Sequence, residues 1–282
     1  MTTMSNERLR RCRRGEPAGR VHTHLATVMT GAERGPEGMA GLAKGLAVIE
    51  SFTAAQPQLT VREAARATGL SPAATRRCLL TLADLGYLHR DGNQFRPTPR
   101  MIRLGSAYSE VAALPTLAQP IVTAARDEIG EAVSVAVLEG AESLIIARAE
   151  VQRIVNTGVW LGARLPATAS ASGRVLLAGL SDDAIDSVLE SGHPVRTTPH
   201  TLVTASGIRD RTYLARTEEV SYTNEELELG VRSMTVPVID SAGRVRAAMT
   251  TSSFAARASI DEMRRRFPPL LRKHAAALGR SL

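Results

Sequence analysis

Two adjacent arginines near the start of a short predicted helix have the most readily interpreted chemistry. Arg76 and Arg77 follow Ser71-Pro72, an N-cap serine and a proline suited to the first helical position. A guanidinium can satisfy two acceptors at once, either O6 and N7 of a guanine or the oxygens of a phosphate. We expect this end of the helix to present to a DNA groove Ser71, Ala73, Thr75, Arg76 and Arg77. Base contacts are assigned to Arg77 or Arg76, and phosphate contacts to Arg62, Arg90 and Arg96.

A second cluster of small polar residues lies further along the chain. Ser170, Ala171, Ser172 and Gly173 stand at the start of an apolar helix expected over Ala171–Ala178. Backbone amides and hydroxyls at a helix start, together with the positive end of the helix dipole, can converge on a carboxylate. The same residues would also make a well-capped helix start, so the pattern alone leaves both interpretations open.

The sequence contains no arrangement typical of an enzyme. It has no Gly-x-Ser-x-Gly nucleophile turn, no Cys-x-x-Cys, no His-Glu-x-x-His and no glycine-rich phosphate loop. The six histidines are scattered, which disfavours a metal or acid-base site. Cys12 and Cys78 are too few for a disulfide framework or a thiolate metal site, and they fit a reducing cytoplasm. The sequence therefore predicts no catalytic residue, no metal and no cofactor.

The excess of positive charge lies entirely in the N-terminal part of the chain. The formal net charge is +7; residues 1–100 hold 15 Lys and Arg against 8 Asp and Glu, and residues 101–282 hold 20 of each. A basic region attracts a polyanion such as double-stranded DNA, because neutralising phosphates releases counterions. Basic residues also serve solubility, so charge alone does not decide between the two interpretations.

The elements that must position the arginines form a recognisable series. A first helix begins near Met39, because Leu42, Leu46, Ile49 and Phe52 recur on one helical face. Thr60 opens a capping box with Glu63, and a short helix follows to Thr68. Gly69 suits a tight turn before a third helix that ends near Leu85, and Asp91-Gly92-Asn93 separates two short strands. This order predicts a winged helix-turn-helix, with a purely structural helical hairpin as the alternative.

The second half alternates predicted helices and strands and indicates a mixed α+β domain. A connecting helix is expected from Thr98 to Ala113, broken by Leu114-Pro115, and a further helix over residues 118–129. Further elements are expected as strands at 133–138, 144–149, 153–159, 234–239 and 245–252, and as helices at 171–178, 182–189, 208–219 and 261–278. Trp160 is expected to fill the core, with the lining of a ligand pocket as the alternative. Arg264-Arg265-Arg266 is interpreted as a solvated helix face without a function.

These patterns divide the chain into four regions. We expect a disordered basic tail over 1–38 (or a wrongly assigned start codon), a DNA-binding winged helix-turn-helix over 39–98, a linker helix over 99–114 and a mixed α+β domain over 115–282. No apolar run reaches the roughly 18 residues of a membrane span. The N-terminus also lacks the apolar core of a secretory signal, so we expect a cytoplasmic protein without a membrane partner.

Several motifs resemble those of the IclR family of transcriptional regulators, in the family's order and spacing over about residues 40–280. They are Lys44–Ile49, Gly86-Tyr87-Leu88, Arg164–Ala178, Glu228–Ser233 and Val236-Pro237-Val238. The run Leu114–Pro120 and the pair Arg153-Ile154 resemble the branch that controls β-ketoadipate-pathway genes of aromatic acid breakdown.

The resemblance implies a fold and a set of partners. The fold is a winged helix-turn-helix, a linker helix and a C-terminal effector-binding domain similar to GAF folds, in a homodimer or homotetramer. The family's effector pocket, carried over by motif position, places a small organic acid against Ser170, Ala171, Ser172, Gly173, Ser233, Thr250 and Ser252. Family members often carry Gly where Ala171 stands and Cys where Ser233 stands.

The expected function is sequence-specific binding of operator DNA under the control of an aromatic or dicarboxylic acid, in regulation of aromatic catabolism genes. The acid would shift the oligomer between geometries that differ in operator affinity. The alternative is a DNA-binding architectural or autoregulatory protein that responds to no ligand.

Overall fold

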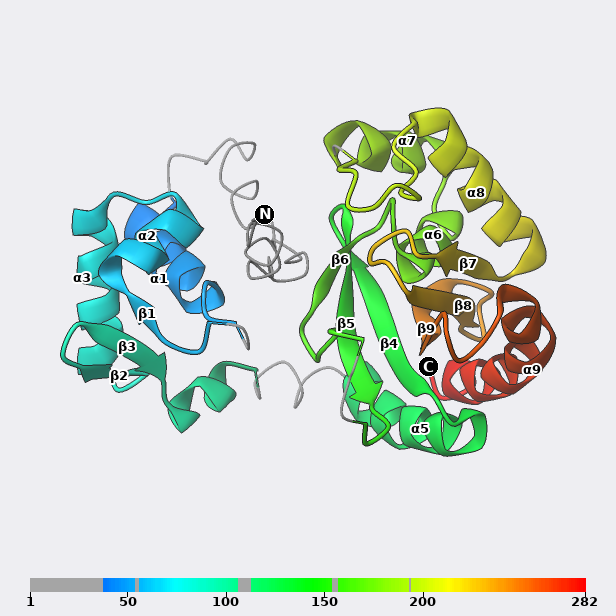
Figure 1. The fold of residues 1–282 in the computed structure, drawn as a ribbon, viewed down its shortest axis with the longest axis horizontal. Coiled ribbons are helices and arrows are strands. Elements are labelled where there is room, and N and C mark those ends of the chain that lie inside the picture. The colour runs from blue at the N-terminus through cyan, green and yellow to red at the C-terminus, as the bar shows by residue number, and fades with distance from the viewer. Residues whose placement is uncertain (1–37, 54–55, 106–112, 154–156, 193) are drawn as a thin grey trace, which may run out of the picture. The chain divides into compact units, whose positions relative to one another are not determined.

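The computed structural model describes residues 38–53, 56–105, 113–153, 157–192 and 194–282. The chain divides into an N-terminal unit that ends at Ile102 and a C-terminal unit from Arg103 to Leu282 (Figure 1). The predicted tail over residues 1–38 falls almost entirely outside the described residues. None of the helices in the described part of the chain is both long enough and apolar enough to cross a membrane.

The N-terminal unit is a winged helix-turn-helix. Three helices and a small antiparallel sheet of order β1-β3-β2 enclose a core that includes Val48, Leu59, Leu79 and Phe95. The elements are α1 (Ala40–Glu50), β1 (Leu59–Thr60), α2 (Val61–Thr68), α3 (Pro72–Asp84), β2 (Leu88–Asp91) and β3 (Gln94–Pro97).

The predicted starts and turns of these helices are confirmed. Thr60 and Glu63 form the full capping box, with the Glu63 amide donating to Thr60 Oγ1 at 3.3 Å and the Thr60 amide donating to the Glu63 carboxylate at 2.8 Å. Gly69 ends α2 with a φ of 68°, a backbone conformation that a side chain disfavours. The amide of Ala74 donates to the hydroxyl of Ser71, which fixes where α3 begins.

The predicted apolar face of α1 is wrong in part. Leu42 and Leu46 are 60% and 47% exposed, whereas Val48 is fully buried and Ile49 and Phe52 pack on the core. Only the C-terminal end of α1 therefore packs against the core, and its buried face is centred on Val48 instead of on Leu42 and Leu46. Strand β1 was also not predicted, because its two residues join the sheet only through pairing with β3.

The predicted break at Leu114-Pro115 is wrong. A 3₁₀ turn, η1 (Pro99–Met101), leads into helical residues 102–105, and the next described element is α5 (Ala113–Ile129). Pro115 lies in the first turn of α5, where the missing N–H would have had no intrahelical partner. The middle of the expected linker helix, residues 106–112, lies outside the described residues.

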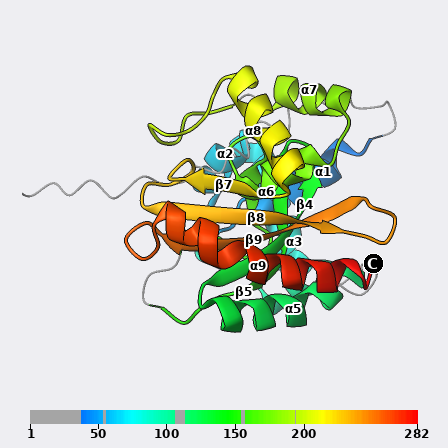
Figure 2. The same ribbon diagram turned by 90° about the vertical axis from the view of Figure 1, so that its right-hand side faces the viewer.

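A six-stranded antiparallel sheet in the order β6-β5-β4-β9-β8-β7 forms the middle layer of the C-terminal unit. Helices cover both faces: α6, α7 and α8 lie on one side of the sheet and α5 and α9 on the other (Figure 2). The strands are β4 (Ala132–Glu139), β5 (Glu142–Ala149), β6 (Arg164–Pro166), β7 (Ser221–Asn224), β8 (Val231–Ile239) and β9 (Val245–Phe254). The remaining helices are α6 (Ala171–Ala178), α7 (Asp182–Ser191), α8 (Ala205–Glu218) and α9 (Ile260–Gly279).

The two faces of the sheet differ in composition. The face towards α5 and α9 is apolar and contributes Met234, Val236 and Met249 to the largest core cluster, together with Phe267 of α9. The face towards α6 is apolar only where Ala136, Ile145 and Ala248 meet this helix. Hydroxyl-bearing side chains occupy much of the rest, so this face is the one that can bind a polar ligand.

Two further predictions in this unit are wrong. No strand occupies the described residues between 151 and 159, since Arg153 turns towards Glu131 and Gly158 adopts a φ of 71°. Trp160 is 45% exposed and does not fill the core. The short strands β6 and β7 were missed, whereas both predicted strands around Gly140 and all four helices α6 to α9 are confirmed with shifts of a few residues at their ends.

Asp240 stabilises the turn between β8 and β9, and this contribution depends on pH. Its carboxylate accepts the amides of Ala242 and Arg244 and the Arg244 guanidinium, and these contacts, chiefly the Arg244 amide, lower its pKa from 3.8 to about 2. The stabilisation is complete above pH 3.8 and is lost as the pH falls towards 2. Urea unfolding of Asp240→Asn and the unmodified chain should give a difference that narrows below about pH 4; a difference independent of pH would contradict this account.

Candidate functional site

The N-terminal half of α3 presents a positively charged, solvent-exposed surface. Ser71, Ala73, Arg76 and Arg77 are exposed, as expected. Within the described residues no ion pair joins Arg76 or Arg77 to a carboxylate, so both guanidinium groups are available to phosphates or bases. Residues 38–102 hold eight Lys and Arg against four Asp and Glu. The arrangement is that of a helix able to enter the major groove.

Thr75 does not belong to this surface, and its assignment as a DNA contact is wrong. Its side chain is fully buried, and its hydroxyl donates to the carbonyl of Ser71 at 3.1 Å. Thr75 lies one helical turn before Leu79, so it belongs to the inward stripe of α3. The exposed side of this part of the helix is formed by Ala73, Arg76 and Arg77.

The wing and α2 carry the other predicted arginines. Arg62, Arg90 and Arg96 are all exposed. Arg90 is held in place, because its Nε donates to the Gly92 carbonyl at 3.0 Å and its guanidinium lies 5.9 Å from the centre of the Phe95 ring. Sequence reasoning missed Arg66 and Arg100, which are exposed in the same unit; Arg100 stacks over Tyr87.

The start of α6 is tightly organised by its own side chains. The Ser170 hydroxyl accepts the amide of Gly173 at 3.0 Å and donates to the carbonyl of Pro166 at 2.8 Å. Ser172 shares a 2.7 Å hydrogen bond with Ser143 of β5. A Cβ on Gly173 would lie 2.2 Å from the Cα of Ala167, so only glycine fits there. The capped-helix interpretation is therefore correct for Ser170 and Gly173, and the amides of Ala171 and Ser172 remain without intrahelical acceptors.

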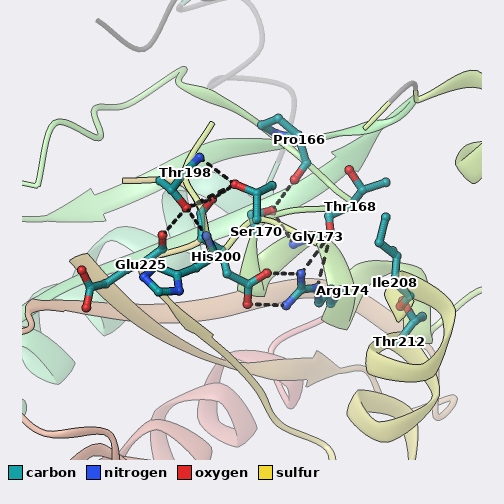
Figure 3. A network of polar contacts seen from close by, with 12 residues as sticks. Pro166, Thr168, Ser170, Gly173, Arg174, Thr198, His200, Ile208, Thr212 and Glu225 are labelled. Carbon is teal, nitrogen blue, oxygen red and sulfur yellow. Dashed lines mark hydrogen bonds and ion pairs between the residues drawn. The ribbon is translucent and has the colours of Figure 1, made fainter. Parts of the chain in front are cut away.

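A buried arginine follows directly and was missed by the sequence reasoning. Arg174 is fully buried and donates to both carboxylate oxygens of Glu226, at 3.0 and 2.5 Å, and to the carbonyl of Thr168 (Figure 3). The hydroxyls of Thr198 and Thr201 in turn donate to the backbone carbonyls of residues 225 and 226. One network thus fixes the start of α6 to two loops. An arginine inside an otherwise apolar helix was its only signal in the sequence.

The predicted strand residues lie on the sheet face that α6 covers. Cross-strand partners place Ser221, Thr235, Thr250 and Ser134 in one row, and Thr223, Ser233 and Ser252 in the next. We call these the hydroxyl rows. Thr235 and Thr250 share a 2.8 Å hydrogen bond, and Ser233 and Ser252 share one of 2.9 Å. The structure therefore brings Ser233, Thr250 and Ser252 together, although no hydrogen bond in the described residues joins them to Ser170–Gly173.

A small cleft with a cavity volume of about 20 Å³ lies at the end of the hydroxyl rows. Of the predicted effector contacts, only Ser252 lines it. The other lining residues are Glu131, Ala132, Arg148, Glu150, Val151, Arg153, Thr157 and Phe254. The cleft combines charged, hydroxyl and apolar groups, but in this structure it has room for little more than one water molecule. The signal that could have found it is Arg148, a charged residue within the apolar strand β5.

The Arg174–Glu226 ion pair should be essential for the stability of the C-terminal unit. Arg174→Met leaves the Glu226 carboxylate buried without its counter-charge and should lower the free energy of unfolding by about 3–5 kcal/mol in urea titrations. Arg174→Met combined with Glu226→Leu should be more stable than Arg174→Met alone, because the unpaired charge is also removed.

The matched control is Lys273→Met, which breaks the exposed pair of Lys273 and Glu128. It should change the free energy of unfolding by less than about 1 kcal/mol. If the effects of Arg174→Met and Glu226→Leu simply add, the two residues are not coupled and the account of this network is wrong.

Comparison with known proteins identifies the family. The model of the IclR helix-turn-helix domain matches residues 41–92, and the model of the C-terminal domain of bacterial IclR transcriptional regulators matches residues 106–280. The chain is 36% identical to the Pca regulon regulatory protein of Pseudomonas putida, over 84% of this chain and 81% of the relative. It is 34% identical to the p-hydroxybenzoate hydroxylase transcriptional activator of Acinetobacter baylyi, over 91% and 97% of the two chains.

A solved structure gives a further match. The structure is that of a double mutant of the inducer-binding domain of the PobR transcription factor from Acinetobacter, in complex with 3-hydroxybenzoic acid. It superposes with a TM-score of 0.57 at 30% identity, covering 61% of this chain and all of that domain. The exposed arginine surface on a winged helix-turn-helix, the C-terminal unit and these matches together show that the chain belongs to the IclR family of transcriptional regulators.

Proposed function

We propose that this chain regulates genes of aromatic acid catabolism by binding double-stranded operator DNA as a homo-oligomer, with an aromatic carboxylic acid as its effector. The observation that carries the proposal is the exposed pair Arg76 and Arg77 at the capped start of α3, without carboxylate partners in the described residues. The relatives named above support the regulon, since two of them are named for the Pca regulon and for p-hydroxybenzoate hydroxylase.

On DNA, α3 takes the major groove and the wing lies along the backbone. Arg76 or Arg77 reads a base edge, while Arg62, Arg90 and Arg96 neutralise phosphates. Arg90 is already stacked on Phe95 and bonded to Gly92, so little side-chain entropy is lost when it meets the DNA. A homodimer or homotetramer would place two such units on a palindromic operator.

In the C-terminal unit, the hydroxyl rows form the proposed effector site. Three regions of the chain then have separate roles in the cytoplasm: residues 39–98 bind DNA, residues 115–282 bind the acid, and residues 99–114 connect these two domains. The support from a relative is the complex of the PobR inducer-binding domain with 3-hydroxybenzoic acid. An acid that binds one geometry of the oligomer more tightly than another shifts the oligomer towards that geometry and so changes operator affinity; the operator changes the affinity for the acid by the same factor.

A gel-shift titration with DNA from upstream of its own gene and of the neighbouring genes tests the whole proposal. We expect a retarded band at low salt, and a change in its midpoint when 3-hydroxybenzoate or 4-hydroxybenzoate is present. Absence of any band at low salt would overturn DNA binding. A band that no aromatic acid shifts, with no heat in calorimetric titration of the acids, would favour a regulator that responds to no ligand.

Substitutions in α3 test the assigned contacts. If Arg76 or Arg77 contacts a base, its substitution by alanine should weaken operator binding about 5- to 100-fold. At the residue that contacts a phosphate, the substitution should instead reduce the slope of log affinity against log salt by about one. Two controls should bind as the unmodified chain does: Thr75→Val, which alters only a buried hydroxyl, and Arg265→Ala, which removes an exposed arginine from α9. If Arg265→Ala lost as much operator affinity as the α3 variants, the titration would report only the net charge of the chain and not contacts made by α3.

A further inference from the structure

A surface pocket of about 380 Å³ lies at the free edge of the six-stranded sheet. The outermost strand here is β7, with α8 on one side of the sheet and α9 on the other (Figure 2). The pocket is lined in part by Arg211, Leu214 and Glu218 of α8, by Tyr222 of β7 and by Arg264 of α9. Its volume falls in the range of roughly 300–1,000 Å³ that is typical of small-molecule sites.

Two arginines from different helices line this pocket without a counter-charge. Arg211 and Arg264 are both exposed, and neither forms an ion pair with a carboxylate of the described residues. Arg264 is held in position, because its guanidinium lies 5.4 Å from the centre of the Tyr222 ring. Glu218 is the one carboxylate in the lining. The pocket therefore has a net positive charge, which favours an anionic ligand.

Tyr222 adds hydrogen-bond donors at the same edge. The Glu225 amide donates to the Val231 carbonyl at 2.9 Å, and residues along an antiparallel strand alternate between bonding their partner strand and facing away from it. The amide of Tyr222, three residues before Glu225, therefore faces the free edge. The Tyr222 hydroxyl has no hydrogen-bond partner among the described residues. Burial raises the pKa of Tyr222, although the charges of Arg264 and Arg272 act in the opposite direction, so the hydroxyl stays protonated at neutral pH and can donate.

The pocket also has an apolar part. Ala215 and Val220 line it and are buried, whereas Leu214 is 43% exposed. A ligand that covers Leu214 with a hydrocarbon surface removes both surfaces from water, which is favourable. An anion with an apolar ring therefore fits this lining better than an inorganic anion does.

We propose that this pocket is a second ligand site, which binds a small organic anion with a carboxylate and one aromatic ring. Arg211 and Arg264 balance the charge of the carboxylate, and the ring covers Leu214. The inference goes beyond the proposed function, because neither arginine belongs to the hydroxyl rows. A ligand bound here joins α8 to α9 across the edge of the sheet.

Calorimetric titration of the full chain with 3-hydroxybenzoate tests the proposal, with two acids bound per chain as the expected result. Arg264→Met or Arg211→Met should weaken one of the two sites about 10-fold, as loss of a hydrogen bond to a charged group does. Glu218→Gln should strengthen the same site, because the carboxylate that repels the acid is gone. The matched control is Arg265→Met, which removes the neighbouring exposed arginine outside the pocket and should change binding less than about twofold.

Two further probes test the chemistry of the ligand. 3-Hydroxybenzamide has the ring without the charge, and inorganic phosphate has charge without a ring. Each should bind at this site at least about 10-fold more weakly than 3-hydroxybenzoate. Equal binding of the amide would contradict the role of the arginines, and equal binding of phosphate would contradict the contact with Leu214.

The outcomes separate this inference from the proposed function. If the chain binds one acid, and neither Arg264→Met nor Glu218→Gln changes its affinity, the second site is overturned and the effector site is not. If the chain binds one acid that Arg264→Met weakens and Ser233→Ala does not, the pocket is supported and the hydroxyl rows lose their proposed role. If the chain binds neither 3-hydroxybenzoate, 4-hydroxybenzoate nor benzoate, both proposals are overturned.

Two controls concern net charge and folding. Equal weakening by Arg264→Met and Arg265→Met would mean that the titration reports only the charge of α9, and the pocket would be overturned. Should Arg264→Met fail to fold by circular dichroism, Glu218→Gln decides, and unchanged or weaker binding of the acid contradicts the proposal.

Discussion

A guanidinium that cannot lose its charge must meet a carboxylate wherever it is buried, and this requirement organises the C-terminal unit. The side chains of Arg174 and Arg148 are buried and that of Arg153 is partly buried, and each pairs with a glutamate; the glutamates differ in their access to water. The side chains of Glu226 and Glu131 are 11% and 9% exposed, whereas that of Glu150 is 40% exposed. The pairs of Arg174 with Glu226 and of Arg153 with Glu131 hold loops and strands in place, whereas the carboxylate of Glu150 is in contact with water.

The N-terminal unit follows a different constraint, the phase of its helices. Once Ser71 caps α3 and Leu79 enters the core, the direction of every other side chain on that helix is determined. Thr75 turns inward and Arg76 and Arg77 turn outward. The arginines of α3 are therefore exposed to solvent because the apolar residues of the same helix face the core.

The elements that sequence could predict are those determined by local chemistry. The capping box at Thr60 and the turn at Gly69 depend on neighbours within a few residues, and both are confirmed. Strands β1, β6 and β7 have two to four residues and exist only because a longer strand pairs with them, so no local pattern reveals them. Pro115 misled the prediction because its effect depends on where the helix starts.

The candidate sites divide in the same way. The arginines of α3 and of the wing were found from type and spacing, and the hydroxyls of β8 and β9 from a family motif that the sheet brings into register. Arg174 and Glu226 are 52 residues apart and Arg148 and Ser134 lie on neighbouring strands, so their roles appear only when the chain folds. In the sequence, the buried Arg174 and Arg148 could be recognised only as charged residues within apolar runs.

The hydroxyl rows have a consequence for which molecules a site of this kind can distinguish. In the pairs Ser233–Ser252 and Thr235–Thr250 either oxygen can be the donor, so each proton can change sides by rotation of two C–O bonds. Such a surface can present a donor to one ligand and an acceptor to the next without moving the backbone. A pocket lined in this way imposes little order on the positions of hydroxyl groups around a ring, and discrimination between ring isomers is left to the shape of the apolar walls.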